Sequence, residues 1–153
     1  MTIQLEPIGT VRGGRTEVVD DNWGGVKARI ELDAARFTAE SLAGLDSFSH
    51  VMVVYYFHRA DPAKIELTAR HPRNNPAWPK IGIFAQRGKN RPNLLGVSTC
   101  QVLGIDGNSL LIQGLDAVDG TPVVDLKPLM KGFEPRGSVF EPVWAGEIMA
   151  NYW

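Results

Sequence analysis

The sequence is divided into short apolar runs by glycine and proline, and this spacing of turn residues limits the chain to folds made of short strands. Of its 153 residues, 16 are Gly and 10 are Pro, which exceeds average usage. The runs between them are rich in β-branched and aromatic residues, and they do not alternate with helical patterns as a parallel α/β sheet requires. We therefore predict a mainly β protein: a small antiparallel or mixed β-barrel with one or two short helices, in a single domain over residues 1–153.

Strand patterns set the expected order of elements. Strands are predicted at 3–11, 26–32, 48–57, 97–105, 109–113 and 122–126, with 65–69 as a short additional one. The segment 48–57 (FSHVMVVYYF) is the most apolar and is expected in the centre of a sheet. Asp106-Gly107 predicts a type I′ hairpin turn between 97–105 and 109–113.

Two segments have helical patterns. Residues 33–45 form the best early helix candidate, because Thr38, Glu40 and Ser41 supply capping chemistry and Gly44 a stop. Residues 143–151 fit either a strand or two helical turns. Residues 131–142, which directly precede this second segment, are interrupted by Gly and Pro and have no assigned structure.

Composition and charge indicate an ordinary soluble globular protein. The chain is 44% hydrophobic and 22% charged, with a formal net charge of −1, so the whole molecule is not a general nucleic-acid binder. It contains no run of about 20 apolar residues and no signal-peptide pattern, which predicts a cytoplasmic protein without a membrane span. A single cysteine, Cys100, excludes an intrachain disulfide and is interpreted as a buried structural thiol.

One part of the chain is locally basic. No Asp or Glu occurs from Leu67 to Ile105, whereas Arg70, Arg73, Lys80, Arg87, Lys89 and Arg91 fall in that window. An ordinary solvated surface and an anion-binding surface both explain such a run. Arg87, Lys89 and Arg91 follow one another on a turn-rich loop between two apolar runs, which suits the binding of an anion.

Several single residues have two interpretations. Trp23 lies in a turn and either covers the core or offers a ring for stacking, and the same alternatives apply to Trp78. His58 follows the central strand, where a structural and a functional role are both open, whereas His50 is interpreted as structural. With His71, these histidines fit no usual zinc spacing, and no metal site is predicted.

Common nucleotide and hydrolase motifs do not occur. The sequence has no G-x-G-x-x-G opening a helix, no G-x-x-x-x-G-K-[ST] and no G-x-S-x-G. A Rossmann fold, a P-loop and a hydrolase triad are therefore not supported.

Five sequence blocks, taken in order, resemble the TsaA-like (TrmO-type) methyltransferase family. They are PIGTV at 7–11, LxxFSH at 45–50, FHR at 57–59, GIFAxRxxxRPNxxGxS at 82–98 and LDxxDGTPVxDxKP at 115–128. The chain has RGKNRPNLLGVS where RSPxRPNPIGLS is more usual in the family, but both arginines, Pro92, Asn93 and Gly96 remain. The resemblance covers most of the chain up to Pro128.

The resemblance implies a β-barrel that binds S-adenosylmethionine at or near a homodimer interface. The activity it implies is N6-methylation of N6-threonylcarbamoyladenosine beside the anticodon of threonine tRNA. Two alternatives remain open: a methyltransferase with the same cofactor site and a small-molecule or protein acceptor, and a module that binds S-adenosylmethionine without turnover.

Carried over by position, the resemblance assigns a set of cofactor contacts. These are Asn22, Trp23, His58, Arg59, Arg87, Val97, Asp116, Ala117, Val118 and Asp119. A guanidinium at Arg87 or Arg91 suits a carboxylate or a phosphate, and Asp116 or Asp119 suits a ribose diol. The other aspartate of the pair is expected to cap the turn beside Gly120.

Catalytic and RNA-binding roles are assigned less fully. No general base is identified, and His58 is the one candidate. The expected phosphate contacts are Arg70, Arg73, Lys80, Lys89 and Arg91, together with His71, and Trp78 is the residue considered for base stacking.

Overall fold

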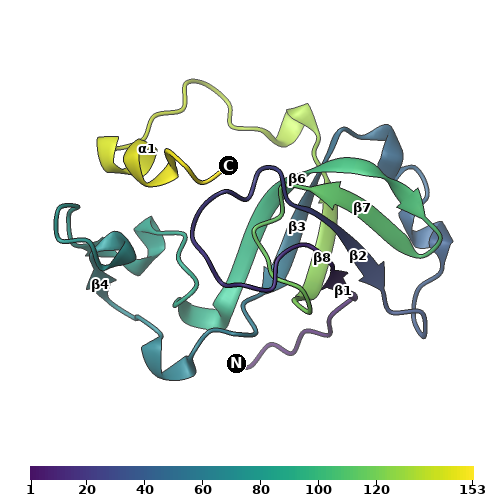
Figure 1. The fold of residues 1–153 in the computed structure, drawn as a ribbon, viewed down its shortest axis with the longest axis horizontal. Coiled ribbons are helices and arrows are strands. Elements are labelled where there is room, and N and C mark those ends of the chain that lie inside the picture. Colours follow the sequence, from purple (N-terminus) through teal and green to yellow (C-terminus); the bar gives the residue numbers. More distant parts are fainter.

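Six antiparallel strands close into a barrel in a computed structural model that describes residues 1–153. Their order around the barrel is β1-β2-β7-β6-β3-β8 (Figure 1). The strands are β1 (Gly9–Arg12), β2 (Lys27–Leu32), β3 (His50–Tyr56), β6 (Leu95–Asp106), β7 (Ser109–Gln113) and β8 (Pro122–Pro128). The predicted mainly β, single-barrel fold is confirmed, and the barrel pairs are antiparallel throughout.

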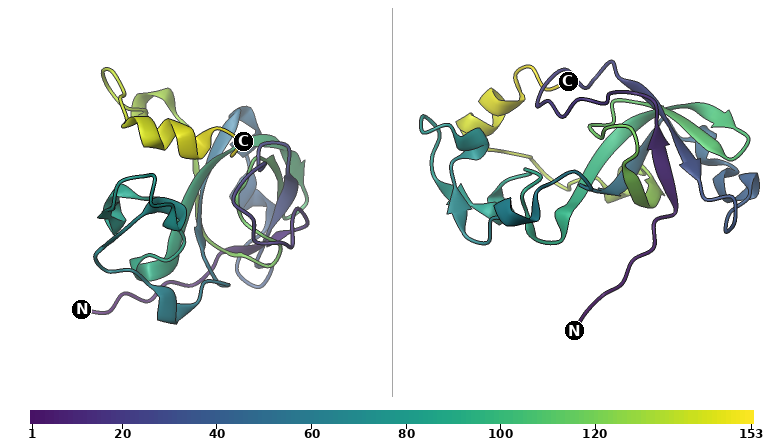
Figure 2. Two further views of the ribbon diagram at one scale, coloured as in Figure 1. Left: turned by 60° about the vertical axis from the view of Figure 1, so that its left-hand side comes forward. Right: turned by 60° about the horizontal axis from the view of Figure 1, so that its bottom comes forward.

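The remaining elements lie beside the barrel. Strands β4 (Ala69–Arg70) and β5 (Ile81–Gly82) form a separate two-stranded sheet, and α1 (Val143–Met149) is a two-turn helix. Seven short 3-10 helices connect the elements: Ala39–Leu42, Leu45–Ser47, Pro62–Lys64, Pro72–Asn74, Ile83–Ala85, Pro92–Leu94 and Lys131–Phe133. Two further views place α1 and the β4–β5 sheet on the same side of the barrel (Figure 2).

β3 corresponds to the strand at 48–57 that was predicted to lie in the centre of a sheet. β3 pairs with β6 along its whole length and with β8 on its other edge. Its alternation directs Val51, Val53 and Tyr55 into the core, where each is buried. Cys100 of β6 joins the same core, and burial raises the pKa of its thiol to about 12, which agrees with its interpretation as a structural residue.

The β6–β7 hairpin was correctly predicted, but its turn type was not. The two residues between the strands are Gly107 and Asn108, and of these only Gly107 has a positive φ, at 56°. A type I′ turn requires positive φ at both central residues, whereas a type II′ turn requires it only at the first, usually a Gly. The turn is therefore of the II′ kind, and Asp106 belongs to the strand.

Three local predictions were wrong or too long. Residues 33–45 form no α-helix; two 3-10 helices lie there, separated by Gly44 at φ 85°, and only Leu42 is buried, so no apolar face supports a longer helix. The strand predicted at 3–11 begins at Gly9, because Pro7 cannot donate to a ladder. The strand predicted at 65–69 reduces to β4.

The segment after β8 is mostly exposed. Residues 130–143 are all solvent-exposed, and α1 buries none of its seven residues. The ambiguous segment 143–151 is thus largely helical rather than a strand. No helix in the chain combines the length and the hydropathy needed to span a bilayer.

Candidate functional site

A carboxylate at the barrel edge gathers three hydroxyl groups from distant parts of the chain. Asp116 lies in the loop between β7 and β8, and its Oδ1 accepts from the Tyr55 hydroxyl at 2.9 Å and from Ser98 Oγ. Its Oδ2 accepts from the Tyr152 hydroxyl. Tyr55 comes from β3 and Ser98 from β6, so the central strand pair holds one side of this group.

The two tyrosines of this cluster stay protonated over the physiological range. Burial raises the pKa of Tyr55, and the nearby Asp116 carboxylate raises it further. The same two causes raise the pKa of Tyr152, while the positive charges of Arg87 and Arg73 oppose the rise. Both hydroxyls therefore act as hydrogen-bond donors to Asp116.

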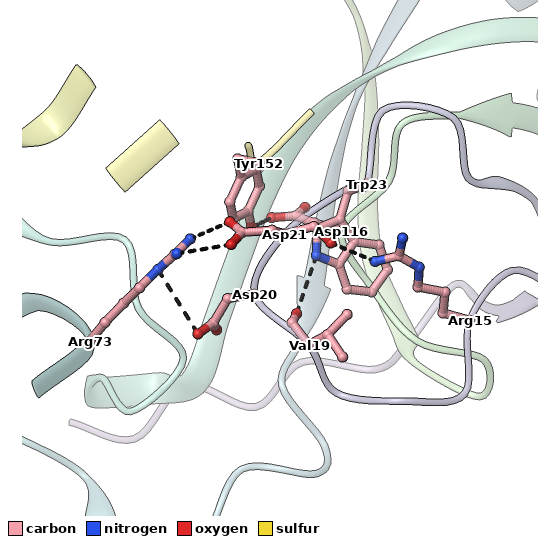
Figure 3. A network of polar contacts seen from close by, with 8 residues as sticks. All are labelled: Arg15, Val19, Asp20, Asp21, Trp23, Arg73, Asp116 and Tyr152. Atoms are coloured by element: carbon pink, nitrogen blue, oxygen red, sulfur yellow. Dashed lines mark hydrogen bonds and ion pairs between the residues drawn. The ribbon is translucent and has the colours of Figure 1, made fainter. Parts of the chain in front are cut away.

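Tyr152 reaches Asp116 because the segment after α1 docks on the loop after β1. The backbone N–H groups of Asn22 and Trp23 donate to the carbonyls of Asn151 and Tyr152 at 2.8 and 2.7 Å. A methyl group at Gly24 would come within 2.7 Å of the Trp153 carbonyl carbon. We call residues 143–153 the closing segment. Figure 3 shows Tyr152, Asp116 and Trp23 as neighbours in this part of the molecule.

The loop between β1 and β2 is ordered by its own contacts. Trp23 is 3% exposed, its Nε1 donates to the Val19 carbonyl at 3.3 Å, and the Arg15 guanidinium lies 4.7 Å from its ring centre (Figure 3). Arg15 also donates to the Asp21 carbonyl at 2.7 Å. The ring of Trp23 is therefore buried beside Arg15, outside the main core cluster.

Arg73 forms an ion pair rather than a free cationic surface. Its guanidinium donates to both carboxylate oxygens of Asp21, at 2.7 and 3.2 Å, and lies 3.9 Å from Asp20 (Figure 3). The hydrogen bonds to Asp21 raise the pKa of the guanidinium. The pair ties the loop after β4 to the loop after β1.

The cationic loop 87–91 also folds back on the chain in part. Arg87 donates to the Val97 carbonyl, and Arg91 donates to the Gln86 carbonyl at 2.8 Å. The buried Gln86 amide in turn donates to the carbonyls of Arg70 and Ile81 at 3.0 and 2.9 Å, which fixes the β4–β5 sheet. Lys80 and Lys89 are exposed and take part in no ion pair.

Two neighbouring residues after β3 face the loops that surround Asp116. Arg59 donates to the Thr16 carbonyl at 2.6 Å. The His58 ring is exposed, and its Nε2 lies 3.9 Å from the position a Cβ would take at Gly120. Partial burial, followed by the positive charge of Arg59, lowers the pKa of His58, so the ring is neutral at pH 7.

Asp119 caps a turn. Its Oδ1 accepts from the Gly13 N–H at 2.8 Å, and its own N–H donates to the Arg15 carbonyl at 2.7 Å. This contact joins the β7–β8 loop to the loop after β1. The residues between the two aspartates, Ala117 and Val118, are buried and join or border the core.

An apolar groove lies away from this cluster. It has a volume of about 500 Å³ and is lined by Leu32, Phe37, Leu42, Phe48 and Leu126, among others, between the barrel and the 3-10 helices of 39–47. None of its lining residues belongs to the Asp116 cluster. No three His, Cys, Asp or Glu side chains gather where they could hold a metal ion, and the absence of a metal site stays a prediction.

Comparison with known proteins assigns the chain to a family. Residues 21–134 match the family model of the tRNA-methyltransferase O N-terminal domain. A protein of Methanothermobacter thermautotrophicus named probable S-adenosyl-L-methionine-binding protein is 32% identical over 139 residues, which cover 90% of this chain and 97% of that protein. The chain belongs to the tRNA-methyltransferase O family.

Longer relatives and solved structures agree with this membership. The human tRNA (adenine(37)-N6)-methyltransferase is 34% identical over 103 residues, which cover 67% of this chain but only 23% of the human protein. The crystal structure of TrmO from Pseudomonas aeruginosa superposes with a TM-score of 0.74 at 27% identity, covering 94% of this chain and 63% of that one. The chain thus spans between a fifth and a half of the length of most curated relatives that it matches.

Within this tRNA-methyltransferase O domain, four of the ten predicted cofactor residues lie in or contact one loop. Residues 13–24 contact Arg59, Asp119 and Arg73 through the hydrogen bonds above, and contain Asn22 and Trp23. Arg87 and Val97 contact each other. The cofactor and RNA roles of all these residues remain predictions.

Sequence reasoning missed four residues of the site. Tyr55, Tyr152 and Arg15 belong to no motif, and Ser98 is the last residue of the family block at 82–98 but was given no role. Tyr55 pairs with Gly96, and Ser98 lies two residues further along β6, opposite Val53. The inward side of a strongly alternating strand was the available signal for Tyr55. Tyr152 lies 36 residues from Asp116, beyond the family blocks, and no local pattern connects the two.

Proposed function

We propose that this chain binds S-adenosylmethionine and transfers its methyl group to N6 of N6-threonylcarbamoyladenosine beside the anticodon of threonine tRNA. The observation that carries the proposal is the polar cluster around Asp116, bordered by Arg87 and the loop 13–24, in a domain of the tRNA-methyltransferase O family. The human relative named tRNA (adenine(37)-N6)-methyltransferase supports the acceptor. Proteins named S-adenosylmethionine-dependent methyltransferase or binding protein support the cofactor.

The donor set fits the polar groups of this cofactor. The Asp116 carboxylate accepts hydroxyl protons and suits a ribose diol. Arg87 carries a guanidinium that pairs with a carboxylate bidentately, and in the free protein it is held only by the Val97 carbonyl. Arg59 and His58 complete the proposed rim on the side of Thr16 and Gly120.

In the proposed reaction, the main task of the protein residues is to align the methyl donor with the acceptor nitrogen. When bound, S-adenosylmethionine supplies a methyl group on a sulfonium, whose departure as a neutral thioether needs no acid. The residues around Asp116 orient the reacting groups, and orientation of this kind lowers barriers by about 7–11 kcal/mol. His58 is the proposed proton acceptor for the adenine nitrogen, supported by its lowered pKa, which keeps the ring neutral at pH 7.

The proposed RNA surface rests chiefly on lysines. Lys80 and Lys89 are exposed and unpaired, and they lie in the stretch without acidic residues. Arg70 and Arg91 keep part of their guanidinium groups available, whereas Arg73 is committed to Asp21. Trp78 Nε1 donates to Glu147 Oε2 at 2.7 Å, and the His71 ring is hydrogen-bonded to the Trp78 carbonyl at 2.7 Å, so both residues already have partners in the free protein.

A homodimer is part of the proposal. The chain has 9744 Å² of accessible surface, whereas a compact monomer of 16.8 kDa has about 7,600 Å². Within 130–143 the exposed apolar side chains are Met130, Phe133, Val139, Phe140 and Val143. A second copy is the occupant this surface suits, because cofactor sites at a shared interface are expected from the family.

Light scattering tests the dimer. Phe140→Asp should shift the mass of the purified protein toward that of one chain. Phe84→Asp is the matched control, since Phe84 is 79% exposed but lies outside this segment. A single-chain mass for the unmodified protein would remove the dimer from the proposal.

A second function is favoured by one relative. The Methanothermobacter protein, matched over 97% of its length, carries a name that states cofactor binding and no transfer. The chain would then bind S-adenosylmethionine without turnover, or transfer its methyl group to another small molecule or a protein. The lone buried thiol of Cys100 supports a cytoplasmic location for any of these functions.

One assay separates these functions. Purified protein is incubated with isotope-labelled S-adenosylmethionine and threonine tRNA, and the nucleosides are analysed by mass spectrometry. Methylated N6-threonylcarbamoyladenosine supports the first function. If calorimetry shows that the cofactor binds but no labelled nucleoside forms, the second function is supported. If the cofactor does not bind, both functions are excluded.

A further inference from the structure

The Asp116 carboxylate has little acceptor capacity left in the free protein. Its two oxygens offer about four lone-pair directions. Tyr55 and Ser98 use two of them on Oδ1, and Tyr152 uses one on Oδ2. One direction on Oδ2 is therefore free.

A ribose diol needs more acceptor directions than the single one that is free on Asp116. Two hydroxyls that donate to one carboxylate need two acceptor directions, and Oδ2 offers two only when Tyr152 leaves. Tyr55 and Ser98 are buried on the paired strands β3 and β6, whereas Tyr152 lies outside the barrel, so Tyr152 is the donor that can leave with the least change to the fold. This step rests on the proposed function, in which Asp116 receives the ribose of the cofactor.

We propose that the Tyr152 hydroxyl occupies the position of a cofactor hydroxyl on Asp116, and that the closing segment leaves the site when S-adenosylmethionine binds. Tyr152 is thereby a self-inhibitory contact, and cofactor affinity reflects the fraction of molecules in which the segment is undocked.

The attachment of the closing segment suits such a movement. α1 buries no residue, and the preceding residues 130–142 are exposed, so undocking uncovers little apolar surface. Its polar anchors are the two backbone bonds from Asn22 and Trp23, the Trp78 to Glu147 contact and Tyr152 itself. The barrel core contains none of its residues.

Two substitutions weaken docking by different routes. Tyr152→Phe removes the hydroxyl and keeps the ring. Gly24→Ala places a methyl group 2.7 Å from the Trp153 carbonyl carbon and touches neither Asp116 nor Tyr152. Gly25→Ala is the matched control, because nothing lies within 4 Å of its added Cβ and its φ is not positive.

Calorimetric titration with S-adenosylmethionine tests the inference. Tyr152→Phe and Gly24→Ala should both bind it more tightly than the unmodified protein, by about tenfold to 150-fold, the range set by one hydrogen bond to a charged group. Gly25→Ala should not differ. Equal or weaker binding by both variants overturns the inference and leaves the proposed function intact, whereas no binding by any protein overturns the function as well.

Hydrogen exchange supplies an independent measurement. Saturating S-adenosylmethionine should speed amide exchange in residues 143–153 while slowing it in the loop 115–120. Slower exchange in 143–153 on binding would mean that Tyr152 stays docked on the occupied site, and would overturn the inference even if affinities change.

Discussion

The Tyr55 hydroxyl donates to Asp116 Oδ1 at 2.9 Å and thereby fastens the β7–β8 loop to the central strand. The ring of Tyr55 has room to do so because Gly96 lies beside it in β6. It packs edge-on against Phe57 with ring centres 5.3 Å apart. The position of the carboxylate thus depends on core packing, which couples the candidate site to the stability of the barrel.

Gly96→Ala should destabilise the protein by about 1–3 kcal/mol. A Cβ at this position would lie 2.4 Å from the Tyr55 ring and 2.9 Å from Phe57, so the ring must shift and its hydroxyl must move from Asp116. Urea denaturation followed by tryptophan fluorescence measures the change. Gly25→Ala, with open space around its Cβ, should be nearly neutral; equal effects of the two would show that the ring is not constrained.

Arg87→Ala should abolish binding of S-adenosylmethionine, because it removes the guanidinium proposed to hold the carboxylate of the cofactor. Lys89→Ala should leave cofactor binding unchanged and weaken tRNA binding, with the salt dependence of tRNA affinity reduced by about one phosphate contact. Calorimetry and filter binding at several salt concentrations measure the two effects. Loss of both functions in both variants would contradict this division of the loop.

The sequence predicted the barrel better than the site. β3 and the β6–β7 hairpin were predictable because alternation and a Gly-containing turn are local signals. Residues 33–45 were not, because Leu42 is their only fully buried residue and Gly44 separates two 3-10 helices there. The family blocks located Asp116, but its partners Tyr55, Ser98 and Tyr152 meet only through the barrel closure and the docking of residues 143–153, which no local pattern encodes.

Basic residues show the same limit. From the stretch without acidic residues, five basic residues were predicted to contact phosphates, with no distinction between them. Arg73 is bound to Asp21, 52 positions away in the sequence, while Lys80 and Lys89 remain free. A count of charges within one segment cannot detect a partner that tertiary structure supplies.

The Arg73–Asp21 pair should stabilise the fold rather than bind RNA. Its side chains are only 26% and 33% exposed, and the guanidinium binds both carboxylate oxygens. We therefore expect a coupling energy of about 1 kcal/mol, at the upper end of the range for surface ion pairs. A double-mutant cycle with Arg73→Ala and Asp21→Ala, measured by urea denaturation, gives this energy. Arg73→Ala should reduce tRNA affinity less than Lys80→Ala does; the reverse order would return Arg73 to the RNA surface.

His58 should titrate below its ordinary pKa of 6.5, because partial burial and then the charge of Arg59 both disfavour the imidazolium. A folded-state pKa below the unfolded value means that the unfolded chain binds the proton more readily. The contribution of His58 to stability is therefore fully present above pH 6.5 and declines as pH falls through the folded pKa. NMR titration of the ring protons measures this pKa, and Arg59→Ala should raise it toward 6.5 without fully restoring it, since burial is the larger cause. If His58 is the proton acceptor, the rate of methyl transfer should be constant at high pH and fall as pH drops through the folded pKa of His58, below 6.5. A rate that falls with an apparent pKa above 6.5 would exclude His58 as the base.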